Sequence, residues 1–297
     1  MLRTRSRIVR AIRTFFDDRG YLAAETPLLC AHPIPEAHIQ RMTTRYDPPD
    51  YADAAPIELA LLPSPEYWLK RLIAAGAGSV YEIARSFRNV ESISSGHRPE
   101  FTMLEYYTLD ADAARSLELT QQLLAALGWT GSTRICSVTE LWREHVGGDL
   151  TDMLRSGAVD ADAFQLQFVN LIEPELAAHD AVFVCDYPAA IPTLARMRPH
   201  TPWAERWELY LGGLEVANCY TEETDPVRIA AFFAAEQAAL SPARRMQLEP
   251  SYLADPPLPP CSGVALGVDR LVMALTGAQD IREVISYSFF DTLSGNS

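Results

Sequence analysis

Strand-like segments joined as hairpins constrain the fold of this chain more than any other feature. Alternating apolar and polar residues at 79–88 and 99–108 flank a polar loop, and WELYLGGLEVAN carries two further strand patterns around a Gly-Gly turn. Two glycines between strands are a favoured hairpin connection. Because hairpin strands pair antiparallel, this order favours an α+β fold with an antiparallel sheet flanked by helices over a doubly wound parallel sheet.

The remaining periodicities complete this outline. Strand patterns also occur at 21–25, 57–62 and 181–185, and GVALGVDRLVMALT carries a strand that leads into a helix. Helical patterns lie at 4–18, 65–75, 112–127, 137–146, 160–178 and 226–240. No internal repeat or long Gly/Ser linker divides the chain, so we expect a single catalytic domain over 1–297 with a helical insertion at about 111–200.

Length and composition indicate an ordinary globular protein. At 297 residues and 48% hydrophobic content, the chain can bury one substantial core, and it has no run of eighteen apolar residues that would indicate a membrane span. The basic N-terminal segment places apolar residues at helical spacing, which predicts a surface helix rather than a targeting peptide. Five scattered cysteines without a CxxC pair indicate the reducing cytoplasm.

The charge balance argues against nucleic acid as the main partner. The formal net charge is −14 at pH 7, and Lys70 is the only lysine. Binding to nucleic acid draws much of its free energy from lysine and arginine side chains that neutralise phosphates. A long-range attraction toward tRNA is therefore not expected, although a local arginine patch remains compatible with the sequence.

Two neighbouring segments carry charged groups where strands end or are buried. In EFTMLEYYTL, alternation places Phe101, Met103, Glu105 and Tyr107 on one face of a strand. A glutamate inside an apolar strand requires a cation or a hydrogen-bond donor, which is either a ligand or a neighbouring arginine. Arg88 ends the preceding strand, and its planar guanidinium suits a phosphate. The alternative for Arg88 is an ion pair with Glu82 or Glu105.

Carboxylates at 208–222 and glycines at 263–267 indicate two further candidate binding segments. If Leu211 pairs with Leu214, Tyr210 opposes Glu215 and Glu208 lies diagonal to it, at a spacing that lets two carboxylates share Mg²⁺ with phosphates. The alternative is a pair of solvent-facing glutamates. Glu222, in NCYTE, offers a second anionic wall. Gly263 and Gly267 leave room for a ligand beside a strand, and Arg270 at the following helix start can stack on a purine or contact phosphate.

In order and spacing, these segments resemble the three motifs of the class II aminoacyl-tRNA synthetases, in particular the lysyl branch. GYLAAETPLL at 20–29 resembles motif 1, RSFRN followed by HRPEFTMLEYY resembles motif 2, and GVALGVDR resembles motif 3. SPEYWLKRL at 64–72 and LEVANCYTEETD at 214–225 are typical of lysyl enzymes, and the similarity covers nearly the whole chain. Because the chain begins just before motif 1, without an anticodon-binding domain, it is most similar to the stand-alone ligases that attach (R)-β-lysine to elongation factor P.

The resemblance implies a role for each matching residue. Arg88 would contact the substrate carboxylate and the α-phosphate of ATP, and Phe101 and Arg270 would enclose adenine. Glu66 would bind the backbone-side ammonium of the substrate, Tyr107 and Glu222 the ε-ammonium, and Glu208 and Glu215 would hold Mg²⁺. The same motifs add Ser64, Pro65, Glu105, Asn218, Tyr220 and Ala265 to the amino-acid site, and Asn89, Glu91, His97, Arg98, Glu215, Val216 and Gly267 to the ATP site.

The resemblance further implies ATP and Mg²⁺ as cofactors, lysine or (R)-β-lysine as substrate, and a lysine of elongation factor P as acceptor. It also implies a homodimer that is located in the cytoplasm. A truncated synthetase that charges tRNA or another carrier, and a non-catalytic regulatory paralogue, remain as alternatives. This sequence departs from the family pattern at Val90 and Glu91, where the motif 2 loop is one residue longer, and at Arg98, where an asparagine is usual. Ala265 replaces the glycine of the lysyl synthetases, and its methyl group narrows the pocket in favour of a β-amino acid.

Overall fold

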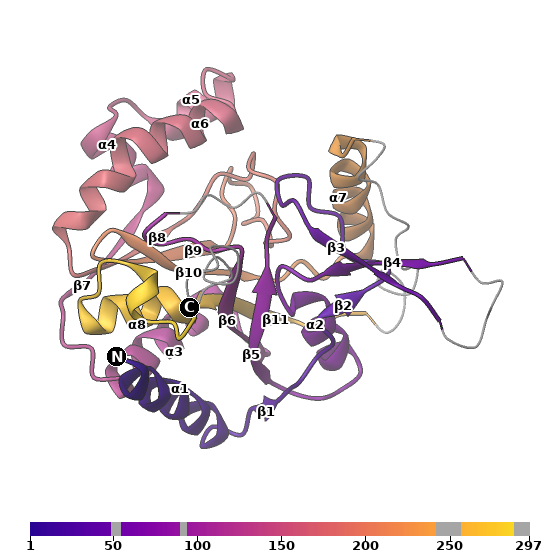
Figure 1. Cartoon of the computed structure of the whole chain (residues 1–297). Coiled ribbons are helices and arrows are strands. Elements are labelled where there is room, and N and C mark those ends of the chain that lie inside the picture. The colour runs from indigo at the N-terminus through magenta and orange to yellow at the C-terminus, as the bar shows by residue number, and fades with distance from the viewer. Residues whose placement is uncertain (49–54, 90–93, 242–256, 288–297) are drawn as a thin grey trace.

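The computed structural model describes residues 1–48, 55–89, 94–241 and 257–287, and its centre is a large twisted sheet (Figure 1). The strand order is β1-β5-β6-β11-β10-β9-β8-β7. These strands are β1 (Leu22–Ala23), β5 (Val80–Phe87), β6 (Glu100–Leu109), β7 (Thr133–Ser137), β8 (Ala181–Cys185), β9 (Arg206–Leu211), β10 (Leu214–Thr221) and β11 (Cys261–Gly267). The central strands are antiparallel, whereas β1 runs parallel to β5 and β7 runs parallel to β8 at the two edges.

Both predicted hairpins form. Strands β5 and β6 pair antiparallel from Val80 with Tyr107 to Phe87 with Glu100. Strands β9 and β10 meet at a two-residue turn whose glycines, Gly212 and Gly213, both have positive φ angles of 56° and 81°. That conformation matches the right-handed twist of the flanking strands and is open to glycine without strain.

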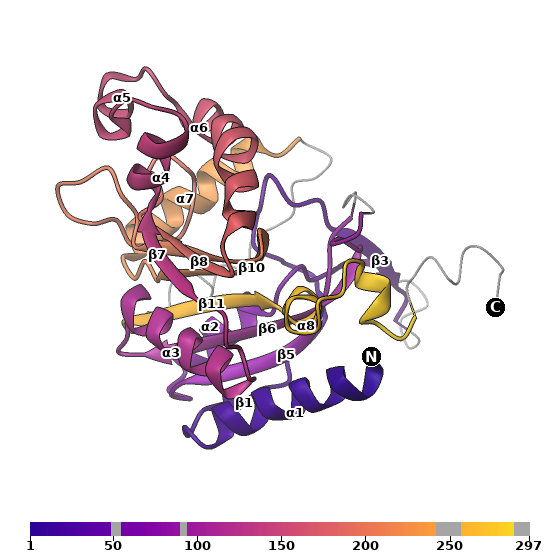
Figure 2. The same ribbon diagram turned by 90° about the vertical axis from the view of Figure 1, so that its left-hand side faces the viewer.

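Three helices cover one face of the sheet: α1 (Leu2–Asp17), α3 (Ala113–Ala126) and α8 (Val268–Thr276), as Figure 2 shows. They pack around a core to which α1 contributes Ile12 and Phe16, both fully buried. The Phe16 ring lies 5.0 Å from the Tyr81 ring and 4.7 Å from the Tyr106 ring, which joins the first helix to β5 and β6. The functional clefts therefore open on the opposite face.

An ion pair connects these layers next to the clefts. Arg5 on α1 lies 2.6 Å from Asp269 at the start of α8, and its guanidinium also donates to the Thr102 hydroxyl. The second oxygen of Asp269 accepts the Thr102 backbone N–H at 2.8 Å. The start of α8 is thereby fixed against β6. Arg270 directly follows Asp269 in the chain, and Phe101 directly precedes Thr102.

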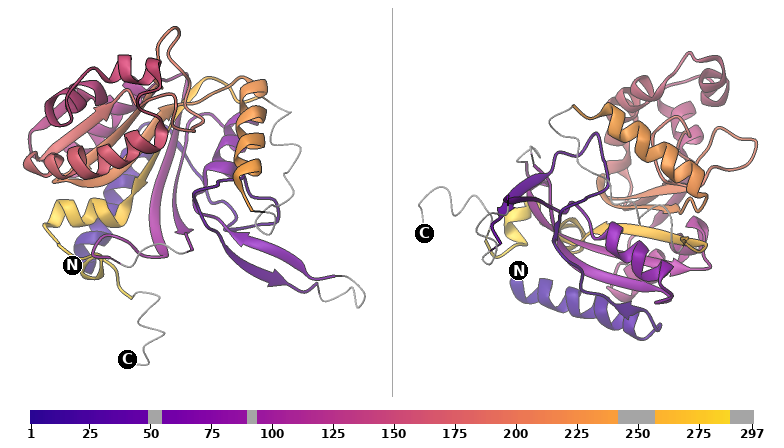
Figure 3. Two further views of the ribbon diagram at one scale, coloured as in Figure 1. Left: turned by 90° about the horizontal axis from the view of Figure 1, so that it is seen from above. Right: turned by 90° about the vertical axis from the view of Figure 1, so that its right-hand side faces the viewer.

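The other face carries α2 (Glu66–Ala74), which packs on β5 and β6, and α7 (Pro226–Ala239). A three-stranded sheet in the order β2-β4-β3 contains β2 (Leu29–Cys30), β3 (Met42–Tyr46) and β4 (Ile57–Leu61), and its β3–β4 hairpin projects from the body of the molecule (Figure 3). None of the helices in the described ranges is long and apolar enough to cross a membrane.

The middle of the chain is less helical than expected. It contains α4 (Val138–His145), α5 (Leu150–Ser156), α6 (Ala161–Gln167), a π-helical turn η1 (Phe168–Ile172) and a 3-10 turn η2 (Glu173–Ala178). The predicted helix 160–178 is therefore three pieces, and the proline at 174 begins the last of them. Because α3, β7 and β8 belong to the main layers, the helical insertion is narrower than 111–200 and centres on α4 to η2.

Candidate active site

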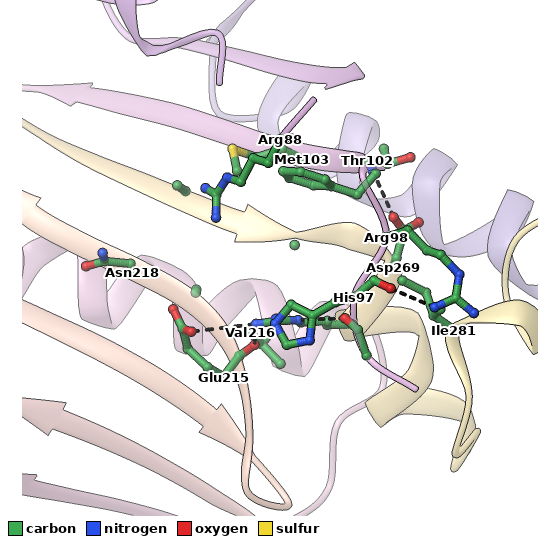
Figure 4. Close-up of a pocket in the computed structure, with 16 residues that line it drawn as sticks. Arg88, His97, Arg98, Thr102, Met103, Glu215, Val216, Asn218, Asp269 and Ile281 are labelled. Carbon is green, nitrogen blue, oxygen red and sulfur yellow. Dashed lines mark hydrogen bonds and ion pairs between the residues drawn. The ribbon is translucent and has the colours of Figure 1, made fainter. Parts of the chain in front are cut away.

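A cleft of about 290 Å³ opens between β5, β6 and β11 on one side and β10 with the start of α8 on the other. Most residues expected at the nucleotide site line it (Figure 4): Arg88, His97, Arg98, Phe101, Glu215, Val216, Gly267 and Arg270. Asn218 and Ala265, expected at the amino-acid site, line it as well. Asn89 does not line it, because this exposed residue follows β5 and its backbone N–H bonds to the Gln40 carbonyl. Glu91, also expected there, lies outside the described residues.

Arg88 presents its guanidinium group to this cleft. Its guanidinium carbon lies 5.3 Å from the centre of the Phe101 ring, and its buried Nε has no hydrogen-bond partner among the described residues. The alternative ion pairs with Glu82 and Glu105 are not formed, because Glu82 accepts hydrogen bonds from Thr26 instead. A buried guanidinium beside an aromatic face is suited to an anion that carries a planar base, such as a nucleotide.

Arg270 lies across the cleft. Its guanidinium donates to the Glu215 carbonyl at 2.8 Å and to the Gly96 carbonyl at 3.2 Å, and its Nη2 lies 2.5 Å from His97 Nε2. These contacts hold the motif 2 loop against α8. The guanidinium of Arg270 is only partly buried, so it can stack on a base while it keeps these backbone acceptors.

Arg98 differs from the expected ATP contact. Its side chain is buried and turns to the C-terminal segment, where Nη2 lies 3.6 Å from Asp280 and Nη1 donates to the backbone carbonyls of Ser94 and His97. The Ile281 N–H also donates to the Ser95 carbonyl, at 2.7 Å. The arginine therefore ties the motif 2 loop to residues 280–281 at the edge of the cleft.

The expected magnesium pair, Glu208 and Glu215, is arranged differently from the prediction. The pairs Leu211 with Leu214 and Tyr210 with Glu215 form as expected, but a bulge at Val216 places Asn218, not Ala217, opposite Glu208. Glu208 is buried, and it accepts hydrogen bonds from Arg206 at 2.6 Å, Tyr187 at 2.5 Å and Tyr210 at 2.8 Å. The simple diagonal geometry is thus wrong. Glu208 is also not solvent-facing, whereas 41% of the Glu215 side chain is exposed.

The oxygen donors nevertheless fit Mg²⁺. Partial burial and the charge of Glu208 raise the pKa of Glu215, although 41% of its side chain is exposed; a cation between the two carboxylates would lower this pKa again. A carboxylate has about four lone-pair positions, and the three donors on Glu208 leave one open. Within the described ranges no three His, Cys, Asp or Glu residues form a metal cluster, so phosphate oxygens and water would complete the shell.

A second, acidic pocket lies behind Asn218. A cavity of about 340 Å³ is lined by Glu66, Tyr220 and Asn218, the last of which also lines the nucleotide cleft. Glu66 begins α2, directly after Ser64 and Pro65, and the Ser64 hydroxyl accepts the Glu66 backbone N–H at 2.9 Å. The two cavities therefore adjoin at Asn218, which lines both.

Glu105 and Glu222 are buried next to this pocket, and Ser64 and Lys70 connect them to Glu66, which lines it. Glu105 accepts hydrogen bonds from Ser64 at 2.5 Å and Tyr107 at 2.8 Å and does not pair with an arginine. Burial, together with the charge of Glu66, raises the pKa of Glu105 to about 8. Burial also raises the pKa of Glu222 to about 7, and its Oε1 has no hydrogen-bond partner in the described part of the chain. Buried carboxylates with raised pKa values favour a cationic ligand.

Gly263 makes room for Glu222 and for Tyr107. It lies on β11 between Tyr107 on β6 and Tyr220 on β10. A Cβ at this position would lie 2.4 Å from the Tyr107 ring and 2.7 Å from Glu222 Oε1. The glycine predicted to allow close approach therefore admits two pocket side chains, whereas a Cβ at Gly267 would meet its nearest atom only at 3.8 Å.

Two acidic residues of this region were not predicted from the sequence. Glu36 and Glu236 line the second cavity, and Glu236 on α7 accepts the Ala37 backbone N–H at 2.6 Å. Burial and the charge of Glu66 raise the pKa of Glu36 to about 7. The segment PIPEAH carries no strand or helix pattern, and only the tertiary fold brings it to the pocket.

Comparison with known proteins identifies the family of this chain. The family model for class II tRNA synthetases (D, K and N) matches residues 1–290. The chain belongs to this class II synthetase family. Its predicted resemblance and fold class are thereby confirmed, and the chain is an ATP-dependent ligase of the class II synthetase type.

Curated relatives in this family match almost the whole chain. A protein of Erwinia tasmaniensis named "Elongation factor P--(R)-beta-lysine ligase" is 36% identical over 307 residues, which cover 96% of this chain and 93% of the relative. Proteins of the same name from Hamiltonella defensa and Vibrio cholerae are each 33% identical. These alignments cover 95% and 97% of this chain, and 93% and 95% of the respective relatives.

Proposed function

We propose that this class II ligase activates (R)-β-lysine, or lysine, with ATP and transfers it to a lysine side chain of elongation factor P. The observation that carries the amino-acid assignment is the acidic pocket contiguous with the nucleotide cleft. Glu66, Glu105 and Glu222 face one resident ammonium, that of Lys70. A diammonium guest satisfies these carboxylates, whereas a neutral or acidic side chain would leave them buried without compensation. The names of the relatives support the acceptor.

The first reaction step needs positioning more than covalent chemistry. The amino-acid carboxylate attacks the α-phosphorus of ATP, the bond to the pyrophosphate oxygen breaks, and pyrophosphate leaves. Arg88 and Arg270 line the same cleft, where Arg88 would orient the carboxylate and neutralise the α-phosphate, and Arg270 would bind the nucleotide. When bound by Glu208 and Glu215, Mg²⁺ would neutralise phosphate charge. In the second step a neutral acceptor amine attacks the carbonyl carbon, the bond from that carbon to the phosphate oxygen of AMP breaks, and AMP leaves; the new amide nitrogen loses a proton to solvent.

Amino-acid-dependent exchange of labelled pyrophosphate into ATP tests the activation step. We expect exchange with (R)-β-lysine and weaker exchange with lysine, because the Ala265 methyl group lines the cleft between Asn218 and Glu105. Elongation factor P should then gain the mass of one aminoacyl group. An acid-labile ester on tRNA would instead support a synthetase, and no exchange with any diammonium amino acid would leave a non-catalytic paralogue.

The assembly we propose is a homodimer in the cytoplasm, which agrees with five free cysteines. Exposed apolar side chains gather on the motif 1 segment and the β3–β4 hairpin: Leu22, Leu28, Leu29, Tyr46 and Ile57. Sedimentation equilibrium should report a dimer, and Leu29→Asp should shift it toward monomer. Leu166→Asp, on exposed α6, is the matched control, and a monomeric parent protein would contradict the assignment.

A further inference from the structure

Lys70 is the only lysine of the chain, and it is buried beside Glu66, which lines the amino-acid pocket. It lies one turn after Glu66 on α2, with Nζ 2.5 Å from Glu66 Oε1. The same Nζ lies 2.6 Å from Glu222 Oε2, although Glu222 follows β10 on the other side of the pocket. One ammonium therefore joins the two carboxylates that were expected to bind opposite ends of the substrate.

Aromatic rings enclose this ammonium. Nζ lies 5.9 Å from the centre of the Tyr107 ring and 5.7 Å from that of the Tyr220 ring. A cation over aromatic rings gains a further electrostatic attraction when it is desolvated. Only 6% of the Lys70 side chain is exposed, so its head group does not reach solvent. A buried ammonium stays charged only where carboxylates pair with it, so the carboxylates of Glu66 and Glu222 stabilise the charged form of Lys70.

We propose that Lys70 is a positioning residue that sets the charge of the amino-acid pocket, so that the pocket accepts a guest with two ammonium groups. This inference rests on the function proposed above. When all three are ionised, the carboxylates of Glu66, Glu105 and Glu222 together with the one ammonium of Lys70 leave two negative charges. A guest with two ammonium groups matches that remainder, while its own carboxylate is directed to Arg88 in the adjoining cleft.

Other titratable groups also lie around the pocket. Arg206 lines the cavity but pairs with Glu208 at 2.6 Å, and Glu236 lines it while it accepts the Ala37 backbone N–H. Burial raises the pKa values of Tyr107, Tyr220 and Cys261, so all three are neutral. Glu36, from the 33–39 segment, has a pKa raised to about 7 and lines the outer part of the cavity. Glu36 adds negative charge at the mouth as pH rises, which attracts a cationic guest without contacting Lys70.

If the Lys70 ammonium is removed, we expect the pH dependence of KM for the amino acid to change. Carboxylates must be ionised to bind ammonium groups, so KM for the amino acid should fall as pH rises through the raised pKa values of Glu222 and Glu105. Lys70 lowers both pKa values. Without it both carboxylates keep their protons to higher pH, and the fall in KM should move to higher pH.

The test is pyrophosphate exchange with (R)-β-lysine between pH 6 and 9 for the wild type, Lys70→Met and Lys70→Arg. Methionine keeps much of the side-chain length without charge. We expect Lys70→Met to raise KM about tenfold at pH 7 and move the KM curve by about one pH unit, with a smaller change in kcat, since one pKa unit is a factor of ten. Lys70→Arg, which keeps the charge, should retain the wild-type midpoint.

Two outcomes would overturn this role. A lower KM in Lys70→Met would mean that the resident ammonium competes with the substrate, and an unchanged midpoint with lower thermal stability would mean a purely structural role. If Lys70→Met does not fold, the double variant Lys70→Met with Glu66→Gln replaces it, because it keeps a net charge of two ionised carboxylates. The midpoint of its KM curve should stay near that of the wild type. A displaced midpoint would refute the charge argument. Absence of exchange in the wild type would refute the proposed function instead.

Discussion

Arg88→Ala is expected to lower the rate of amino-acid-dependent pyrophosphate exchange by about 10²–10³-fold, the range for loss of a donor that stabilises charge in a transition state. The guanidinium is the cation of the cleft that lies over Phe101, and its buried Nε has no hydrogen-bond partner in the part of the chain that the structure describes. Because it neutralises charge that develops during attack on phosphorus, kcat should fall more than KM rises. Steady-state exchange at several ATP concentrations separates the two constants.

The matched control is Arg85→Ala on the same strand. Arg85 is exposed, lies 3.7 Å from Glu100, and does not line the nucleotide cleft, so its loss should leave exchange within about twofold, as expected of an exposed pair. Arg88→Lys keeps the charge without the planar fork and should recover only part of the rate. Wild-type exchange by Arg88→Ala would remove Arg88 from the mechanism.

The sequence predicts the central hairpins because their signals are local. The Gly-Gly turn sets the start of the β9–β10 register, and alternation identifies β5 and β6. The bulge at Val216 is not visible in the sequence, because nothing in LEVAN differs from a regular strand. Strands β3 and β7 were also missed: MTTRY is largely exposed and TRICS is short, so neither shows the alternation of a half-buried strand.

The nucleotide residues were easier to predict than the charge balance of the amino-acid pocket. Arg88, Phe101 and Arg270 stand in motifs whose spacing indicates their common location, and all three line one cleft. The sequence did not predict a role for Lys70 in the pocket, because a lysine on an amphipathic helix is usually exposed. Its burial depends on Glu222, about 150 residues away, and therefore on how β10 packs against α2.

Gly263→Ala is the second change expected to have a large effect. The new methyl group would overlap the Tyr107 ring and Glu222 Oε1, at 2.4 and 2.7 Å, and both side chains belong to the amino-acid pocket. Overpacking of this kind costs about 1–3 kcal/mol of stability. Displacement of groups that position a substrate by about 1 Å can cost 10²-fold in rate, so we expect kcat/KM for (R)-β-lysine to fall by about that factor.

The distribution of this loss between the two reactants distinguishes a local from a global effect. Because Gly263 contacts the ammonium wall and does not line the nucleotide cleft, KM for the amino acid should rise while KM for ATP stays near the wild-type value. Gly267→Ala is the steric control, since its methyl group would meet nothing closer than 3.8 Å and lies on the nucleotide side. It should leave KM for the amino acid unchanged. If Gly263→Ala instead raised both KM values equally, or left both unchanged, Tyr107 and Glu222 would not form the ammonium wall, and the cationic guest would have to bind elsewhere.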